Sequence, residues 1–337
     1  MAPSTRNLLI GSSLVVVVGL CTGLVAFYGA PTSSRDTVMS ELAYIPADVS
    51  AVGFADVRGI MDSGFRQKLR EVMPTGSEKD RLYEETGIDV ERDIDTVVAG
   101  FSGHDGPAGA LVVFRGRFDQ TRIEELAVTR GAERQSYSGR TLLVGLTPPA
   151  GEHLHASTDH VAAIAFLDDD HLALGEVNAV RTAIDTAASN DGVTSNAELM
   201  RFITSVQDTG NAWLVGRAAD ISTQPQIPDQ VRGQFDGIQW ISVSAAVGSD
   251  VRGLVRAQAL DDARGEQLRS MVGGAVAAAR MFTQQDPRLA AALESVQATG
   301  TGPDVELSFR ISPELLDLIG QHRDRVEGSL LPPPAAN

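Results

Sequence analysis

The chain contains a single cysteine among its 337 residues, and this scarcity excludes several kinds of site. An intramolecular disulfide, a cysteine-rich zinc site and a cysteine-ligated cluster each need more than one cysteine. Basic residues are also few, with 28 Lys+Arg against 44 Asp+Glu and a net charge of −16. Because most of such a surface repels a polyanion, we do not expect nucleic acid as a partner.

Common catalytic motifs are missing as well. A phosphate-binding loop needs Gly-Lys, but the two lysines follow Gln67 and Glu78. No histidine precedes a glutamate, which excludes the helical zinc-protease motif, and neither G-x-S-x-G nor S-x-x-K occurs. The sequence therefore predicts no catalytic residue and no cofactor, and we expect a protein that is not an enzyme.

One long uncharged run is present, over residues 8–28. As a helix, these 21 residues would be about 31 Å long, which is roughly the hydrocarbon thickness of a bilayer. Arg6 precedes the run and several acidic residues follow it, so the positive end should stay in the cytoplasm. The sequence predicts a single-pass cell-membrane protein with a cytoplasmic N-terminus and an extracytoplasmic C-terminal domain.

Two further features of this run bear on its role. A cleaved signal peptide is the alternative, and it would make the domain secreted or periplasmic; however, Tyr28 and Leu24 stand where a cleavage site needs small residues. Gly19 and Gly23 have the G-x-x-x-G spacing that lets two membrane helices approach closely. They are the candidate residues for a weak homodimer through the membrane helix.

The rest of the chain divides by composition. We predict a cytoplasmic tail over residues 1–7, the membrane or signal segment over 8–28, a small polar linker over 29–40, an exported domain over 41–327 and a disordered tail over 328–337. The domain is expected either as one unit or as two halves, at about 41–190 and 191–327.

Strand and helix signals alternate within residues 41–327. Hairpins are predicted at Ser138-Gly139 and at 248–250, helix caps at Asp56 and Asp119, and a long amphipathic helix over 262–282. The pattern predicts an α+β fold of mainly antiparallel sheets with packed helices. Residues 113–119 and 213–220 both read as an apolar strand, Gly-Arg and then Asp; either a duplicated sheet-and-helix unit or chance would explain the match.

Histidines crowd into the segment GEHLHASTDH, residues 151–160. His153, His155 and His160 are the weak candidates for a zinc or copper site, because imidazoles at such spacings can share an ion. A flexible loop gives these ligands no preset geometry, and neither a rigid element nor supporting hydrogen-bond partners are evident. A solvated loop is therefore the favoured interpretation, and no metal site is predicted.

Several short runs carry a family resemblance. They are YIPADVSAVGFADVR at 44–58, TGID at 86–89, DID at 93–95, RGRFD at 115–119, FLDD at 166–169 and NAELM at 196–200. Together they resemble an uncharacterised family of bacterial membrane-anchored envelope proteins with a domain of unknown function, over about residues 41–319. The resemblance implies an exported, anchored domain, and it carries no catalytic residues.

Three functions stay open at this point. The first is a non-enzymatic envelope domain at the outer face of the cytoplasmic membrane that binds an envelope protein or a ligand by its sheet surface. The second is a carrier or sensor of a small apolar ligand or lipid, with a cavity enclosed by the small-residue helix 273–279 and its sheet. The third is a metal-dependent hydrolase that uses the loop at 152–160.

Overall fold

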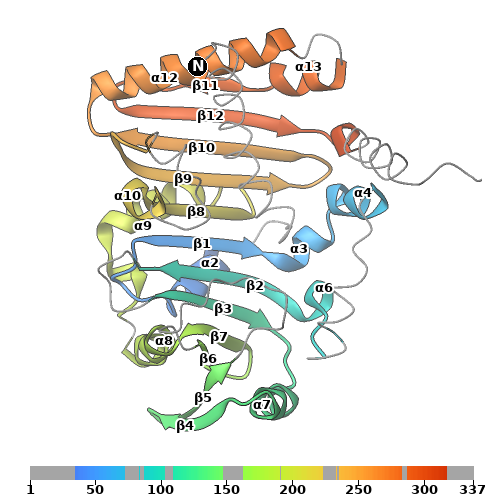
Figure 1. Cartoon of the computed structure of the whole chain (residues 1–337), viewed down its shortest axis with the longest axis vertical. Coiled ribbons are helices and arrows are strands. Elements are labelled where there is room, and N and C mark those ends of the chain that lie inside the picture. Colours follow the sequence, from blue (N-terminus) through green and yellow to red (C-terminus); the bar gives the residue numbers. More distant parts are fainter. Residues whose placement is uncertain are drawn as a thin grey trace, which may run out of the picture.

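The structure is a computed structural model that describes residues 35–72, 83, 87–102, 109–146, 162–189, 191–222, 233, 235–282 and 287–316. Its strands form one twelve-stranded sheet in the order β11-β12-β10-β9-β8-β1-β2-β3-β7-β6-β5-β4 (Figure 1). Every neighbouring pair is antiparallel. The predicted α+β class with antiparallel strands is therefore confirmed, as a single continuous sheet.

The bounds of the strands and helices are as follows. The strands are β1 (Ala51–Asp56), β2 (Ile94–Phe101), β3 (Ala110–Gly116), β4 (Glu133–Tyr137), β5 (Arg140–Leu146), β6 (Ala162–Phe166), β7 (His171–Glu176), β8 (Ala212–Arg217), β9 (Ile238–Val247), β10 (Val251–Ala259), β11 (Gln297–Thr299) and β12 (Asp304–Ile311). The helices are α2 (Arg35–Leu42), α3 (Val57–Met61), α4 (Gly64–Val72), α6 (Val90–Asp93), α7 (Gln120–Thr129), α8 (Val177–Ser189), the 3-10 turn η1 (Val193–Ser195), α9 (Ala197–Val206), α10 (Ala218–Ser222), α12 (Asp262–Phe282) and α13 (Pro287–Glu294).

Local signals account for many of these bounds. The Asp56 carboxylate accepts a hydrogen bond from the Gly59 amide at the start of α3, and Asp119 caps α7 in the same way. Ser138 and Gly139 both have positive φ, 47° and 78°, as a two-residue hairpin turn requires. The hairpin β9–β10 and the long helix α12 also lie where the sequence predicts them.

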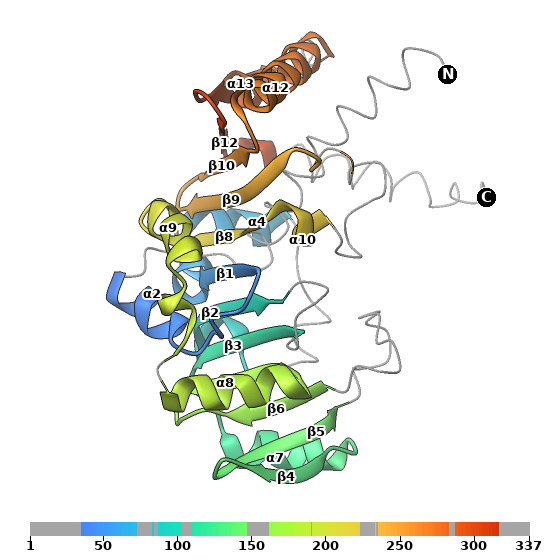
Figure 2. The ribbon, with the colours of Figure 1, turned by 90° about the vertical axis from the view of Figure 1, so that its left-hand side faces the viewer.

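One face of the sheet is closed by α2, α8 and α9. Seen edge-on, α2 and α9 lie on one side of the strands and α10 on the other (Figure 2). The main core lies between the sheet and helices α2, α8 and α9, where Leu42, Leu199 and Ile203 are at most 1% exposed. Phe54 of β1 stacks there on Trp213 of β8 at 5.8 Å between ring centroids. This face thus holds the bulk of the apolar burial that stabilises the domain.

The order of elements occurs twice along the chain. A helix, a strand, a short helix, a hairpin and a further helix occur in this order as α2-β1-α3-β2-β3-α7, with α4 and α6 inserted between α3 and β2, and again as α9-β8-α10-β9-β10-α12. The two sets meet where β1 pairs with β8 at the middle of the sheet. In this order β8 corresponds to β1, whereas residues 113–119 end β3. The predicted correspondence of 113–119 with 213–220 is therefore wrong, because those segments occupy different places in the repeated order.

Two boundaries differ from the prediction. Helix α2 begins at Arg35, inside the segment 29–40 that composition assigns to a linker, and its Val38 is 1% exposed in the core. The apolar stripe after Asp56 predicts one helix, but the structure has α3 and α4, separated at Asp62 and Ser63. The Ser63 hydroxyl accepts a hydrogen bond from the Arg66 amide, so it caps the second helix and stabilises the break.

The predicted membrane segment 8–28, with Gly19 and Gly23, and the C-terminal tail 328–337 lie outside the described residues. Within the part of the chain that the structure describes, no helix is both long and apolar enough to cross a bilayer.

Candidate functional site

The histidine loop does not contribute to the site described below. His153, His155 and His160 lie outside the described residues. Over the ranges that the structure does describe, no group of three or more His, Cys, Asp or Glu side chains is placed to hold a metal ion.

A polar cluster occurs where α2 meets the sheet. It consists of Glu41, Tyr44, Arg115, Asp168 and His171. The imidazole of His171 lies between two carboxylates, with Nε2 3.2 Å from Glu41 Oε2 and Nδ1 2.7 Å from Asp168 Oδ1. The Tyr44 hydroxyl donates to Asp168 Oδ2 at 2.6 Å, and the tyrosine ring packs on the imidazole at 4.4 Å between centroids. Arg115 adds a second cation beside Glu41, at 3.4 Å.

This geometry sets the protonation of the cluster. Burial alone would lower the pKa of His171, but the hydrogen bonds to Glu41 and Asp168 outweigh it and raise the pKa above its usual value. Burial would likewise raise the pKa of Asp168, but the hydrogen bonds from Tyr44 and His171 keep it below its usual range. Because both ring nitrogens face carboxylates, the arrangement favours the imidazolium, in which both nitrogens donate. The cluster is therefore a set of paired charges in which His171 and Arg115 face Glu41 and Asp168.

The arrangement serves packing better than catalysis. Both nitrogens of His171 are engaged, so the ring has no free basic nitrogen to accept a proton from a substrate. Glu41 is 1% exposed and fastens the last turn of α2 to β3 and β7. A comparable contact occurs in the other half, where Arg256 of β10 donates to the carbonyl oxygen of Ser205 in α9 and pairs with Glu306. We therefore assign the cluster to helix docking.

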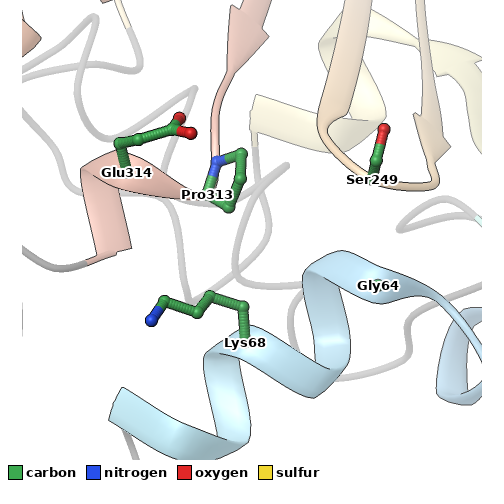
Figure 3. A pocket seen from close by; sticks show the side chains of 5 residues that line it. All are labelled: Gly64, Lys68, Ser249, Pro313 and Glu314. Carbon is green, nitrogen blue, oxygen red and sulfur yellow. The ribbon is translucent and has the colours of Figure 1, made fainter.

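A surface pocket lies between α4, the β9–β10 turn and the segment after β12 (Figure 3). It has a volume of about 350 Å³ and is lined by Gly64, Lys68, Ser249, Pro313 and Glu314. Its cation is engaged, since Lys68 Nζ lies 3.3 Å from Glu71. The pocket is open to solvent and its lining includes no imidazole or thiol, so it does not resemble a catalytic site or an enclosed cavity for an apolar ligand.

The face of the sheet that no described helix covers carries a more distinctive feature. Residues at one level on seven adjacent strands lie side by side, as the strand register places them, and all are apolar. We call them the apolar row: Val255, Val243, Leu214, Gly53, Ala99, Val112 and Leu174. None of the seven is fully buried, and Leu174 is 36% exposed. Strands spaced about 4.8 Å apart make this row roughly 29 Å long.

Among the described elements, helices border the row without covering it. Beyond one end, Leu307 is buried in β12, on which α12 packs; beyond the other end, Ile164 is buried under α7. On one flank α3 covers the neighbouring level of β2 and β3, and on the other Ile221 of α10 lies over Gly216. Figure 1 looks onto this face, and no described helix crosses its middle strands. An antiparallel sheet with one solvated face usually places polar residues there, so an apolar row is unusual.

Sequence reasoning missed both features. The cluster joins residues more than a hundred positions apart, and only the acidic turn before His171 gave a local signal. The apolar row had a weak signal, because β2, β3 and β8 have apolar residues at consecutive positions, which indicates that both faces are apolar. The alternative that helix 273–279 and its sheet enclose a cavity stays a prediction; Gly273 and Gly274 are exposed, and a Cβ added at either would meet no atom within 4 Å.

Comparison with known proteins adds little. No protein-family model matches the chain, and no curated protein matches it. Two crystal forms of a protein called TP0453, form I and form IV, are distantly similar in structure. Each has a TM-score of 0.45 and 10% sequence identity, over 83% of this chain and 96% of that chain. A likeness this distant supports no argument about function.

Proposed function

We propose that this chain is a non-enzymatic binding protein of the bacterial cell envelope, tethered by its N-terminal segment, and that its apolar row binds a hydrocarbon chain such as the acyl chain of a lipid. The observation that carries the proposal is the row itself, with six apolar side chains and Gly53 side by side on the face that no described helix covers. Transfer of apolar surface out of water is the main favourable contribution such a face can make to binding.

The composition of the row favours hydrocarbon over a protein partner. Protein interfaces concentrate their binding energy in aromatic and arginine side chains. The row has only Val, Leu, Ala and Gly, and these side chains offer no hydrogen-bond donor or acceptor. A ligand held here would be selected by its apolar surface alone.

The predicted membrane tether would hold the domain close to a source of lipid chains. The uncharged run ends at Tyr28 and α2 begins at Arg35, so at most about 25 Å of extended chain separates them. If the run spans the membrane, lipid chains lie within reach of the domain. The net charge of −16 disfavours docking of the whole face onto an anionic bilayer surface, and therefore favours a single chain withdrawn from it.

Binding of a fluorescent long-chain fatty acid to the full chain in detergent tests this proposal. Leu174→Asp should weaken binding by at least about tenfold, because burying a leucine contributes about 1.5–3 kcal/mol and each 1.4 kcal/mol is tenfold. The matched control is Val128→Asp, which changes a 41% exposed valine on α7 that is not part of the row. Equal affinities of the two variants, or no binding by the unaltered chain, would refute the proposal.

A photoactivatable fatty acid adds a second test. It should label peptides from β8, β1, β2 and β3, which carry the middle of the row. Labelling confined to other segments would place the ligand elsewhere.

We infer also that the two halves arose by duplication. The repeated order of elements on either side of the β1–β8 pair supports this inference. Superposing α2 through β3 on α9 through β10 tests it: the strands and short helices should align in order.

A further inference from the structure

Helix α12 turns one long side away from the rest of the molecule. It packs on β10, β11, β12 and α13, with Val276 buried (Figures 1 and 2). On the opposite side all side chains are exposed, and Met271 and Met281 are 44% and 74% exposed. The helix has no charged residue from Ser270 to Ala279. A helix face in contact with solvent normally has charged residues. The uncharged stretch of α12 is therefore more typical of a face that binds a partner.

Two glycines in this helix lack an explanation within the described chain. Gly265 has one, because a Cβ there would lie 2.2 Å from the carbonyl oxygen of Gly302. At Gly273 and Gly274 a Cβ would meet nothing within 4 Å. Glycine destabilises a helix interior relative to alanine, so two adjacent glycines at the centre of an exposed helix are unfavourable for the isolated domain. Close approach of a second backbone would explain them.

Charges on the same edge of α12 indicate what that backbone is. Glu266 lies seven residues before Gly273, and Arg280 lies seven residues after it. Seven residues are about two helical turns, so all three residues lie along one edge. An antiparallel copy of α12 centred on Gly273 places each Glu266 opposite the other copy's Arg280. A parallel copy would instead place like charges together.

We propose that two copies of this chain associate through antiparallel α12 helices that cross at Gly273. The contact is self-complementary, as a two-fold dimer requires. Arg280 donates to the neutral carbonyl oxygens of Leu293 and Val296, so it is held in place and keeps its positive charge. The proposed lipid site is on other strands, and the two proposals stand or fall independently.

Sedimentation of the full chain in detergent tests the contact. Gly19→Leu and Gly23→Leu are introduced throughout, so that pairing of the membrane segment does not contribute. Gly273→Arg should weaken self-association at least tenfold, while the melting temperature measured at concentrations where both chains are monomeric stays equal or rises, because the glycine is replaced by a better helix former in open space. Val128→Arg, an equally charged change on exposed α7, should leave association unchanged.

Charge exchange and cross-linking establish the direction of the helices. Glu266→Arg alone should disrupt the dimer, and the double variant Glu266→Arg/Arg280→Glu should restore it. With Cys21→Ser, an oxidised Gly273→Cys variant should form a disulfide-linked dimer and an Ala263→Cys variant should not. A monomeric unaltered chain, an intact dimer of Gly273→Arg, or equal cross-linking at both positions would overturn the proposal.

Discussion

His171→Gln should remove a pH dependence of stability that the unaltered domain possesses. The imidazolium donates to Glu41, a carboxylate that is 1% exposed, and the hydrogen bonds raise the pKa of His171 above its usual 6.5. A group with a raised pKa stabilises the fold fully below its unfolded value, and this contribution is lost as pH rises through the folded value. Stability should therefore fall on the alkaline side of about pH 6.5. The lowered pKa of Asp168 has the opposite effect on the pH dependence. Its stabilising contribution is lost as pH falls below the usual pKa of an aspartate side chain.

The size of the effect follows from the hydrogen bond that is lost. A hydrogen bond to a charged group contributes about 1.5–3 kcal/mol to stability. The loss should lie at the upper end here, because the buried Glu41 carboxylate would lose the imidazolium and retain its ion pair with Arg115. For a domain of this size that corresponds to a loss of about 3–12 °C in melting temperature at pH 6. Urea unfolding between pH 5 and 9 provides the measurement, with Tyr44→Phe as the control that removes the tyrosine hydrogen bond and keeps the imidazolium. Parallel pH profiles for the unaltered chain and His171→Gln would refute the reasoning.

Three further outcomes are expected, each measured by urea unfolding. Gly210→Ala should destabilise the domain by about 1–3 kcal/mol, since its Cβ would lie 2.3 Å from the carbonyl oxygen of Ala245. Gly273→Ala should stabilise the monomer, measured at low protein concentration, by about 0.5–1 kcal/mol; the reverse order would contradict the packing. Leu316→Ala should cost about 2–5 kcal/mol, because Leu316 is 4% exposed against α4, and removal of residues 331–337 should cost almost nothing. Alanine at His153, His155 and His160 together should change stability by less than about 0.5 kcal/mol and release no zinc; a bound ion lost with the change would favour the metal-dependent hydrolase.

Local chemistry explains which elements could be predicted from the sequence. The caps at Asp56 and Asp119 and the turn at Ser138-Gly139 depend on neighbours within a few residues, and the sequence contains those neighbours. Helix α2 was missed because its start is small and polar, and its place in the core depends on contacts with distant strands. Strand β11 has three exposed residues, too few for a periodic signal.

The candidate sites depend on information that is not local. Periodicity shows which residues of β2 share a face, with one side buried and the other half-buried. Periodicity does not show which face of the sheet the helices cover. The apolar row is exposed because α2, α8 and α9 cover the opposite face and no described helix covers the row. The cluster around His171 likewise needs the register of β3 against β7 and the docking of α2, which only the assembled sheet provides.

The pairing of β1 with β8 has a consequence for assembly of the chain. Five backbone positions from Ala51 to Ala55 face residues that come more than 150 positions later, so β1 remains an unpaired edge until the second half has been made. An exposed edge strand readily pairs with whatever strand is available. During synthesis the first half would therefore be open to capture by another nascent copy, and the completed protein is protected because its own second half closes that edge.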